Sequence, residues 1–226
     1  TVREDEKLLK SSLSKLEREA ALSAVGHLIE DIKKKYNDNE KILNYLEDAQ
    51  EDILEHLEDF KTTEEQALAL PFLKMPKTEP TFTRYTVNVL VSGKDGKGAP
   101  CVFESNPTYY NLFGRIEHKF QYGVAVTDFS MIKAGSLHRA NGGYIVMDAL
   151  DLLINLFAYD AVNRAIKNKE IKIEDVWEQY RLISTTTLKP EAIPLDVKVI
   201  LIGSPYLYYL LYNLDEEYRD LFKVKA

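Results

Sequence analysis

The sequence has little cysteine, no excess of positive charge and no long apolar run. Cys101 is the only cysteine among 226 residues, so no internal disulfide can form and a cytoplasmic location is expected. The net charge of −7 argues against a nucleic-acid-binding surface, which needs a basic face. No apolar run approaches the ~20 residues that span a bilayer, and no signal peptide is visible, so we expect no membrane association.

A phosphate-binding loop is also missing from the sequence. Its pattern is G-x-x-x-x-G-K-[ST], but in the glycine-rich stretch 93–98 the last glycine is followed by Ala99 and Pro100. We therefore interpret this stretch as a β-hairpin turn. The histidines have no spacing typical of a metal site, either to one another or to Cys101; they are His27, His56, His118 and His138.

The first 62 residues contain no proline and repeat apolar residues at helical spacing. One stripe is formed by Leu9, Leu13, Leu16, Ala20, Ala24, Leu28 and Ile32. After a turn signal at 36–39, a second stripe has the four-three alternation of a coiled coil; it is formed by Ile42, Leu46, Ala49, Ile53, Leu57 and Phe60. A short connection predicts antiparallel packing, so we expect residues 1–62 to form a helical hairpin arm.

Residues 63–84 hold three prolines and lose the periodicity, which predicts a linker. From 85 to 226, strand-like and helix-like patterns alternate, as in an α/β domain. Alternating apolar residues predict a strand over 85–91, with 101–104 returning as its partner. Two continuous apolar runs, 144–147 and 197–202, are typical of strands buried in a parallel sheet.

Each of these two apolar runs is followed by a polar side chain, Asp148 after the first and Ser204 after the second. Because the carboxyl ends of parallel strands meet at one edge, we expect both to line the same crevice. An aspartate there can hold Mg²⁺, and a hydroxyl can sense the γ-phosphate of a nucleotide. The alternative is that both are common turn residues that happen to end strands.

The run that ends in Asp148 is similar to the second acidic motif (Walker B) of an ATPase, in which a glutamate usually follows the aspartate and polarises the attacking water. Here Ala149 stands in that place. A methyl group cannot take up a proton, so metal binding can survive at Asp148 while hydrolysis is expected to be lost.

Two aromatic residues, Phe120 and Tyr122, precede Gly123 between a predicted helix and a predicted hairpin. One interpretation is a mobile loop whose rings grip an extended polypeptide. The alternative, which the sequence alone favours, is an ordinary hairpin with aromatic residues in the core.

Several long stretches together carry a resemblance to a known family: Asn106–Glu117, His138–Ala149, Ile193–Gly203 and Leu221–Ala226. From about Tyr85 to its end, the chain resembles the AAA+ region of a Lon-like protease, of the bacterial branch called ATP-dependent protease La. The first 62 residues resemble the arm that this branch inserts into its ATPase domain. The implied fold class is α/β: an antiparallel helical hairpin arm followed by a partial AAA+ (P-loop NTPase-like) core over 85–226.

The resemblance implies roles for individual residues. Asp148 takes the metal-binding acidic position, Ser204 the first sensor, and Arg219 the finger that reaches a neighbouring subunit's nucleotide. Phe120 and Tyr122 fall near the substrate-gripping pore loop, and residues 171–188 fit a hairpin placed before the sensor strand. The implied cofactors of the full-length protein are ATP and Mg²⁺, and the implied partners are unfolded polypeptide and further copies in a ring of six.

In that family the phosphate loop lies upstream of the arm and a Ser-Lys protease domain lies downstream. The sequence contains neither and both its ends look cut, so we expect a fragment that is inactive alone, from an ATP-dependent serine endopeptidase. Two alternatives stay open. One is a non-enzymatic, degenerate AAA+ scaffold whose arm binds a partner, and the other is the gate of an ATP-independent Lon-like protease.

Overall fold

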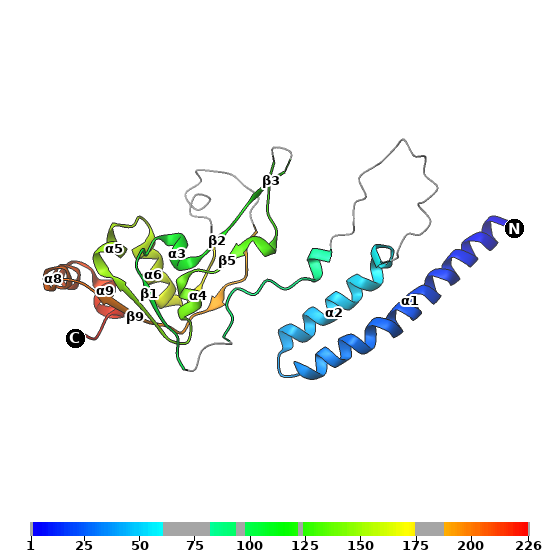
Figure 1. Cartoon of the computed structure of the whole chain (residues 1–226), viewed down its shortest axis with the longest axis horizontal. Coiled ribbons are helices and arrows are strands. Elements are labelled where there is room, and N and C mark those ends of the chain that lie inside the picture. The colour runs from blue at the N-terminus through cyan, green and yellow to red at the C-terminus, as the bar shows by residue number, and fades with distance from the viewer. Residues whose placement is uncertain (1, 61–81, 94–97, 122–123, 175–187, 226) are drawn as a thin grey trace. The chain divides into compact units, whose positions relative to one another are not determined.

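The computed structural model describes residues 2–60, 82–93, 98–121, 124–174 and 188–225 (Figure 1). The chain folds as two compact units, Thr1–Thr86 and Val87–Ala226. Most of the linker predicted at 63–84 and most of the glycine-rich stretch 93–98 lie outside the described residues. Within the described part of the chain, no helix has the length and apolar character needed to cross a membrane.

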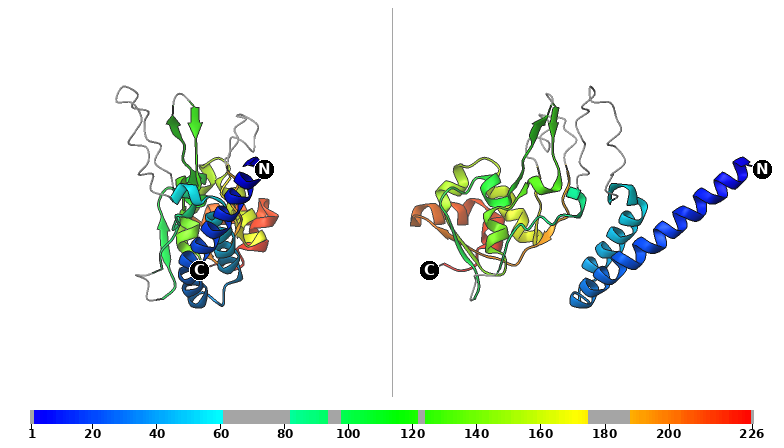
Figure 2. Two further views of the ribbon diagram at one scale, coloured as in Figure 1. Left: turned by 90° about the vertical axis from the view of Figure 1, so that its right-hand side faces the viewer. Right: turned by 45° about the vertical axis from the view of Figure 1, so that its right-hand side comes forward.

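The first unit is built on two helices, α1 (Val2–Lys35) and α2 (Glu40–Glu55), which lie side by side and run in opposite directions (Figure 2). Asn39 begins α2, because its side-chain oxygen accepts a hydrogen bond from the Ile42 amide at 3.2 Å. An ion pair of 3.0 Å joins Lys33 of α1 to Glu47 of α2.

The buried face of α1 is shifted by one residue from the predicted stripe. Leu28 of the predicted stripe is 66% exposed, whereas its neighbour Ile29 is 7% exposed. In α2 the prediction holds better, since Leu46 is buried. At 1.5 Å per residue, the 16 residues of α2 reach along only about half of the 34-residue α1. The leucines early in α1, among them Leu13, therefore stay exposed.

Two short 3₁₀ helices, η1 (Leu57–Phe60) and η3 (Phe82–Tyr85), complete this unit. The Tyr85 hydroxyl donates to Asp52 of α2 at 2.6 Å, and Arg84 pairs with the same carboxylate at 3.2 Å. The hydrogen bond from Tyr85, with the nearby Arg84 charge, holds the pKa of Asp52 below its usual value. Tyr85 therefore belongs to this helical unit and not to a strand.

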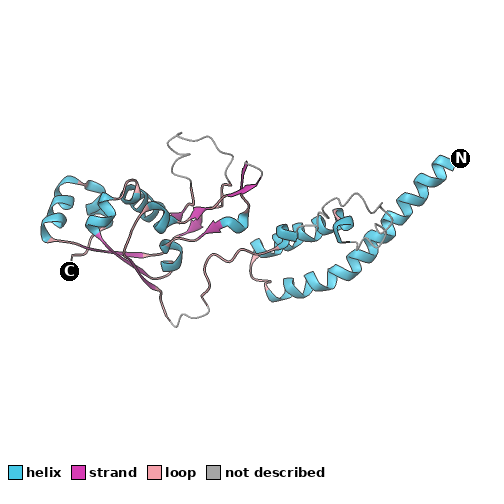
Figure 3. Cartoon of the chain, turned by 45° about the horizontal axis from the view of Figure 1, so that its top comes forward, coloured by secondary structure: helices cyan, strands magenta, loops and turns pink. Residues whose placement is uncertain are grey.

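The centre of the second unit is a parallel sheet (Figure 3). Its strands, in the order β1-β6-β9, are β1 (Cys101–Glu104), β6 (Tyr144–Asp148) and β9 (Lys198–Ile202). The expected α/β class and parallel sheet are therefore observed. The antiparallel pairing expected for 101–104 is wrong, because β1 pairs with β6. Residues 86–93 are irregular and are tied down by Asn88, whose amide donates to the Phe129 and Ile132 carbonyls.

Short elements surround this sheet. The helices are α3 (Tyr109–Phe113), α4 (Ser136–Ala140), α5 (Ala149–Ile154), α6 (Ala158–Asn168), α8 (Pro205–Leu214) and α9 (Glu216–Leu221). The two-stranded antiparallel pairs are β2 (Arg115–Ile116) with β5 (Ile132–Lys133), β3 (Lys119–Gln121) with β4 (Val124–Val126), and β7 (Glu170–Ile171) with β8 (Ile193–Pro194). A 3₁₀ turn, η4 (Phe129–Met131), precedes β5.

The two faces of the sheet differ in burial. Ile145 and Met147 of β6 are fully buried in a core that also contains Leu112, Leu137, Leu152, Val162 and Ile171. On the opposite face Phe103 is 68% exposed and Ile202 is 53% exposed. Parallel sheets are normally covered on both faces, so this apolar face is a surface that the described residues leave open.

The turn into β6 depends on two glycines. Gly142 has a φ of 81°, in the left-handed region that glycine adopts without strain. A Cβ on Gly143 would lie 2.0 Å from the carbonyl oxygen of Pro100. This close approach lets the Tyr144 amide donate to that oxygen at 2.7 Å, which fixes where β6 meets β1.

Replacing Gly143 by alanine should therefore lower the free energy of unfolding by about 1–3 kcal/mol, because the added methyl group displaces backbone. Denaturant unfolding measures this. The control is Gly93→Ala, since a Cβ there meets nothing within 4 Å; its effect should stay within about 0.5 kcal/mol. Equal effects of the two substitutions would contradict the role given to Gly143.

Candidate functional site

The carboxyl ends of β1, β6 and β9 lie at one edge of the sheet. The register pairs Glu104 with Met147 and Asp148 with Ile202, so the strands end nearly level. Ser204 follows two residues beyond β9. The structure thus brings Asp148 and Ser204 to the same edge, as the sequence predicts for strands that run in parallel.

Asp148 also begins a helix. Its Oδ1 accepts hydrogen bonds from the amides of Leu150 at 2.8 Å and Asp151 at 3.1 Å, so it caps α5. Its other oxygen, Oδ2, makes no hydrogen bond to any described residue and is the one that a cation can use. The alternative that Asp148 is an ordinary turn residue therefore accounts for Oδ1, whereas Oδ2 stays available for a ligand.

Ser204 has a similar position at the end of β9. Its Oγ accepts from the Leu207 amide at 3.3 Å, which caps α8, and Pro205 supplies the first helical residue. The hydroxyl proton remains available for donation, because the cap uses only an oxygen lone pair. Capping alone explains a serine here, and donation to a phosphate is compatible with it.

Ala149 follows Asp148 at the start of α5 and is 6% exposed. Its Cβ is 3.3 Å from the place that a Cβ on Gly203 would occupy, so the ends of β6 and β9 are in close contact. Both residues line a groove of about 440 Å³ that runs along β9 and is bounded by α8 and α9. The other residues of this groove include Ser204, Leu207, Tyr208, Leu211, Tyr218 and Phe222.

Glu104 is a second acidic residue at this edge, and it was not among the site residues expected from the sequence. Its carboxylate accepts from the Asn106 amide at 3.0 Å and lies 3.8 Å from the Arg139 guanidinium. The strand that ends in Glu104 was expected to belong to a hairpin, which would have placed Glu104 elsewhere. An acidic residue at the end of a strand was the signal available in the sequence.

Among the described residues, no group of three or more His, Cys, Asp or Glu side chains could hold a metal ion. Asp148 offers a single free carboxylate oxygen, and the phosphate-loop pattern is missing from the sequence. These residues can contribute one ligand to Mg²⁺ but do not by themselves form a site for ATP.

Arg219 lies on α9, and its side chain is 41% exposed. Its guanidinium is 3.7 Å from the exposed Glu216 carboxylate and 6.0 Å from the centre of the Tyr212 ring. It does not line the groove beside Ser204. The structure thus keeps Arg219 apart from that groove and accessible on the surface.

The hairpin β3–β4 carries the predicted pore-loop residues and extends away from the parallel sheet (Figures 1 and 2). Phe120 is on β3, paired with Ala125 in the hairpin register. Tyr122 lies outside the described residues. Most of the hairpin expected over 171–188 also lies outside the described part of the chain.

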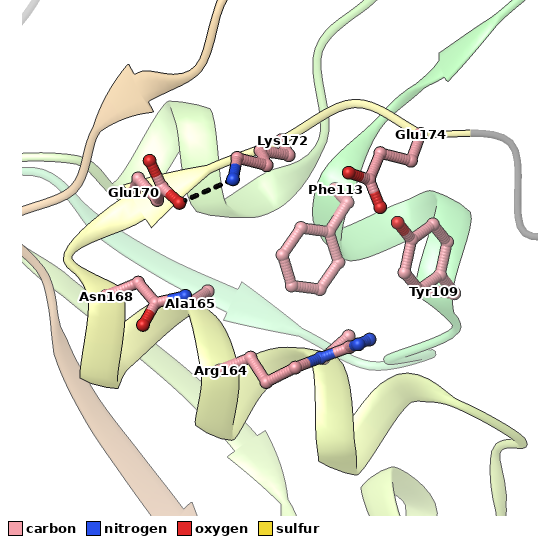
Figure 4. A pocket seen from close by; sticks show the side chains of 9 residues that line it. Tyr109, Phe113, Arg164, Ala165, Asn168, Glu170, Lys172 and Glu174 are labelled. Carbon is pink, nitrogen blue, oxygen red and sulfur yellow. Dashed lines mark ion pairs between the residues drawn. The ribbon is translucent and has the colours of Figure 1, made fainter. Parts of the chain in front are cut away.

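A smaller pocket of about 210 Å³, which the sequence did not indicate, lies between α3, α6 and β7 (Figure 4). Lys172 and Glu170 form a 2.7 Å ion pair at its rim, and this bond raises the pKa of Lys172. Arg164 and Glu174 add one further charge of each sign. Its residues come from separate segments, which is why no local pattern predicted it.

His138 is buried on α4 and plays a structural part. Its Nδ1 accepts from the Gly135 amide at 3.3 Å, and its Nε2 has no partner among the described residues. Burial lowers the pKa of His138, because the charged imidazolium is poorly solvated.

A histidine whose pKa is lowered by folding stabilises the protein above its unfolded pKa of about 6.5, and this contribution falls as the pH drops towards the folded pKa. Between pH 7 and pH 5, His138→Asn, which keeps an acceptor for Gly135, should therefore lose less stability than the unmodified chain. Urea unfolding at both pH values measures this. The exposed His118→Asn is the control, and equal pH dependence in all three proteins would exclude the proposed cause.

Residues 97–226, more than half of the chain, match the family described as "LonB-like, AAA domain". No curated protein matches the chain. The similar solved structures include two of NtrX from Brucella abortus, the second in complex with ADP, at 16% and 15% identity and TM-scores of 0.35 and 0.34. The matches cover 56% and 54% of this chain but only 26% and 24% of the NtrX chains.

At such TM-scores the likeness to NtrX carries no argument about this chain. The family match lies within the second structural unit and includes its whole parallel sheet, with Asp148 and Ser204 at the carboxyl edge. AAA domains generally bind ATP with Mg²⁺. The chain therefore belongs to the LonB-like AAA domain family and contains an AAA+ ATPase-type region.

Proposed function

We propose that this chain is the AAA+ region of a Lon-like serine protease, and that it threads unfolded polypeptide toward a Ser-Lys protease domain outside this sequence. The observation that carries this proposal is the β3–β4 hairpin, which extends from the sheet with Phe120 on one of its strands. Tyr122 follows two residues later in the sequence, outside the described residues. An aromatic side chain on a projecting hairpin can contact any extended chain, because ring packing needs no particular sequence.

The nucleotide part of the proposal assigns a role to the edge of the sheet. Asp148 Oδ2 is proposed as a ligand of Mg²⁺, and the Ser204 hydroxyl as a donor to the γ-phosphate. The phosphate-binding part comes from residues outside this sequence. Support comes from the outer edge of β9, which has no strand partner among the described residues, and from the groove of about 440 Å³ beside it.

The proposed assembly is a ring of six copies, in which Arg219 reaches the nucleotide of the next copy. Its support is a surface on α8 that exposes large side chains, namely Tyr206, Tyr209, Leu210 and Leu214. Contiguous exposed apolar residues are typical of protein interfaces. Arg219 lies on the next helix along the chain, and its side chain is 41% exposed.

Ala149 favours a second candidate function, a degenerate AAA+ scaffold or an ATP-independent gate. Ala149 offers only a buried methyl group at the position where a general base is expected, and Asp148 uses one of its two oxygens as a helix cap. In this alternative, the helical unit would bind a partner or fix the geometry of the ring.

The pore-loop assignment predicts that Phe120→Ala with Tyr122→Ala, in the full-length protein, slows degradation of unfolded casein by about tenfold or more and spares cleavage of a short peptide. The reason is that only a long chain needs to be gripped. The matched control is Phe120→Tyr with Tyr122→Phe, which keeps both rings and should retain casein degradation. Equal loss of both activities in the alanine variant would refute the assignment.

Replacing Ala149 by glutamate tests the nucleotide part. The side chain can extend into the groove beside Ser204, and we expect ATP turnover by the full-length protein to rise on the order of tenfold to a hundredfold, as for a restored general base. Ala149→Gln is the control, because it has the same size but cannot take up a proton. No change, or an equal rise in the glutamine variant, would show that the defect lies elsewhere.

A further inference from the structure

The junction of α8 and α9 consists of a single residue, Asp215. Its amide donates to the Leu211 carbonyl at 2.9 Å and so ends α8. Its Oδ1 accepts from the amides of Glu217 at 2.9 Å and Tyr218 at 3.2 Å and so begins α9. Because no other residue separates the two helices, the backbone of Asp215 sets the direction of α9.

The second carboxylate oxygen of Asp215 connects this junction to the core. Oδ2 accepts a hydrogen bond from the hydroxyl of Tyr159 on α6. Tyr159 packs against the hydrophobic core, and α6 is anchored there by Ala158 and Val162, both fully buried. Burial, together with the Asp215 hydrogen bond, raises the pKa of Tyr159, so its hydroxyl keeps the proton that it donates.

Few other polar contacts hold α9 against α6. The Lys167–Glu217 ion pair is 3.2 Å long, but both side chains are more than half exposed. Ion pairs in solvent contribute about 0–1 kcal/mol, whereas a hydrogen bond from a half-buried hydroxyl to a carboxylate is stronger. The Tyr159–Asp215 bond is therefore the stronger of these two polar contacts between α6 and the start of α9.

The position of Arg219 depends on that restraint, because its own side chain is held only weakly by its surroundings. Its nearest charged partner is Glu216, 3.7 Å away and itself 92% exposed. Arg219 lies four residues after Asp215, about 6 Å along the helix. A change in the direction of α9 at Asp215 therefore moves the Arg219 guanidinium.

We propose that Tyr159 is a positioning residue, which through its hydrogen bond to Asp215 fixes the direction of α9 and the point from which Arg219 reaches a neighbouring copy. The restraint on α9 follows from the contacts of Tyr159 and Asp215. The consequence for ATP turnover rests on the proposed function, in which Arg219 acts on the neighbour's nucleotide.

The restraint is tested by hydrogen exchange, measured by mass spectrometry on the full-length protein. Tyr159→Phe removes the hydroxyl and keeps the ring, so folding is preserved. Amides of 216–222 should exchange on the order of tenfold faster, the factor expected for one lost hydrogen bond to a charged group, while those of α6 do not change. Lys167→Ala, which removes only the exposed ion pair, should leave α9 as it was. Unchanged exchange in Tyr159→Phe would overturn the proposal.

The proposed role of Tyr159 in positioning Arg219 is tested by the kinetics of ATP hydrolysis in the full-length protein. Tyr159→Phe should lower kcat by about tenfold to a hundredfold and leave nucleotide affinity unchanged, because Asp148 is untouched. Lys167→Ala, which removes only the exposed ion pair to Glu217, is again the control and should leave kcat unchanged. If Tyr159 acts through Arg219, adding Tyr159→Phe to Arg219→Ala lowers kcat no further, and an additive loss overturns this role. If the unmodified full-length protein does not turn over ATP, the ATP-dependent function proposed above is refuted. The hydrogen-exchange result would still show whether Tyr159 restrains α9.

Discussion

The pairing of β6 on both of its edges is the constraint on which the second unit depends. Parallel partners are necessarily distant in sequence, and β6 joins β1, some forty residues earlier, to β9, some fifty residues later. The glycine turn before β6 makes this possible, because Gly143 has no side chain to collide with Pro100. With that contact in place, Ile145 and Met147 enter the core, and the carboxyl ends of the three strands come level at one edge.

Polar residues at this edge serve the fold and the candidate site together. Asp148 and Ser204 each cap the helix that follows their strand, and Asp215 caps another while it accepts the Tyr159 hydrogen bond. A carboxylate has two oxygens, so Asp148 can hold α5 in place with one and keep the other for a ligand. The cap makes the position rigid, which is useful for a ligand site and also sufficient reason by itself for an aspartate.

The open parts of the second unit are as informative as its core. One face of the sheet exposes apolar side chains, the outer edge of β9 is unpaired within the described sheet, and α8 presents tyrosines and leucines to solvent. A parallel sheet that stood alone would bury such a face. The α8 surface and the β9 edge support the proposed ring and nucleotide site, and the buried Ala149 favours the ATP-independent alternative.

The sequence by itself determined the helices of the first unit, the two buried strands with polar residues at their ends, and the family, because these follow from local spacing and literal motifs. Two predictions from the sequence were wrong: the buried face of α1 is shifted by one residue, and the strand 101–104 pairs with a different strand. Both features depend on which distant segment packs against the element. The sequence also missed Glu104, the polar pocket beside Arg164 and the Tyr159–Asp215 bond. Only the tertiary structure shows these three features, because each brings together residues from different elements. The local periodicity of the sequence carries no information about such long-range contacts.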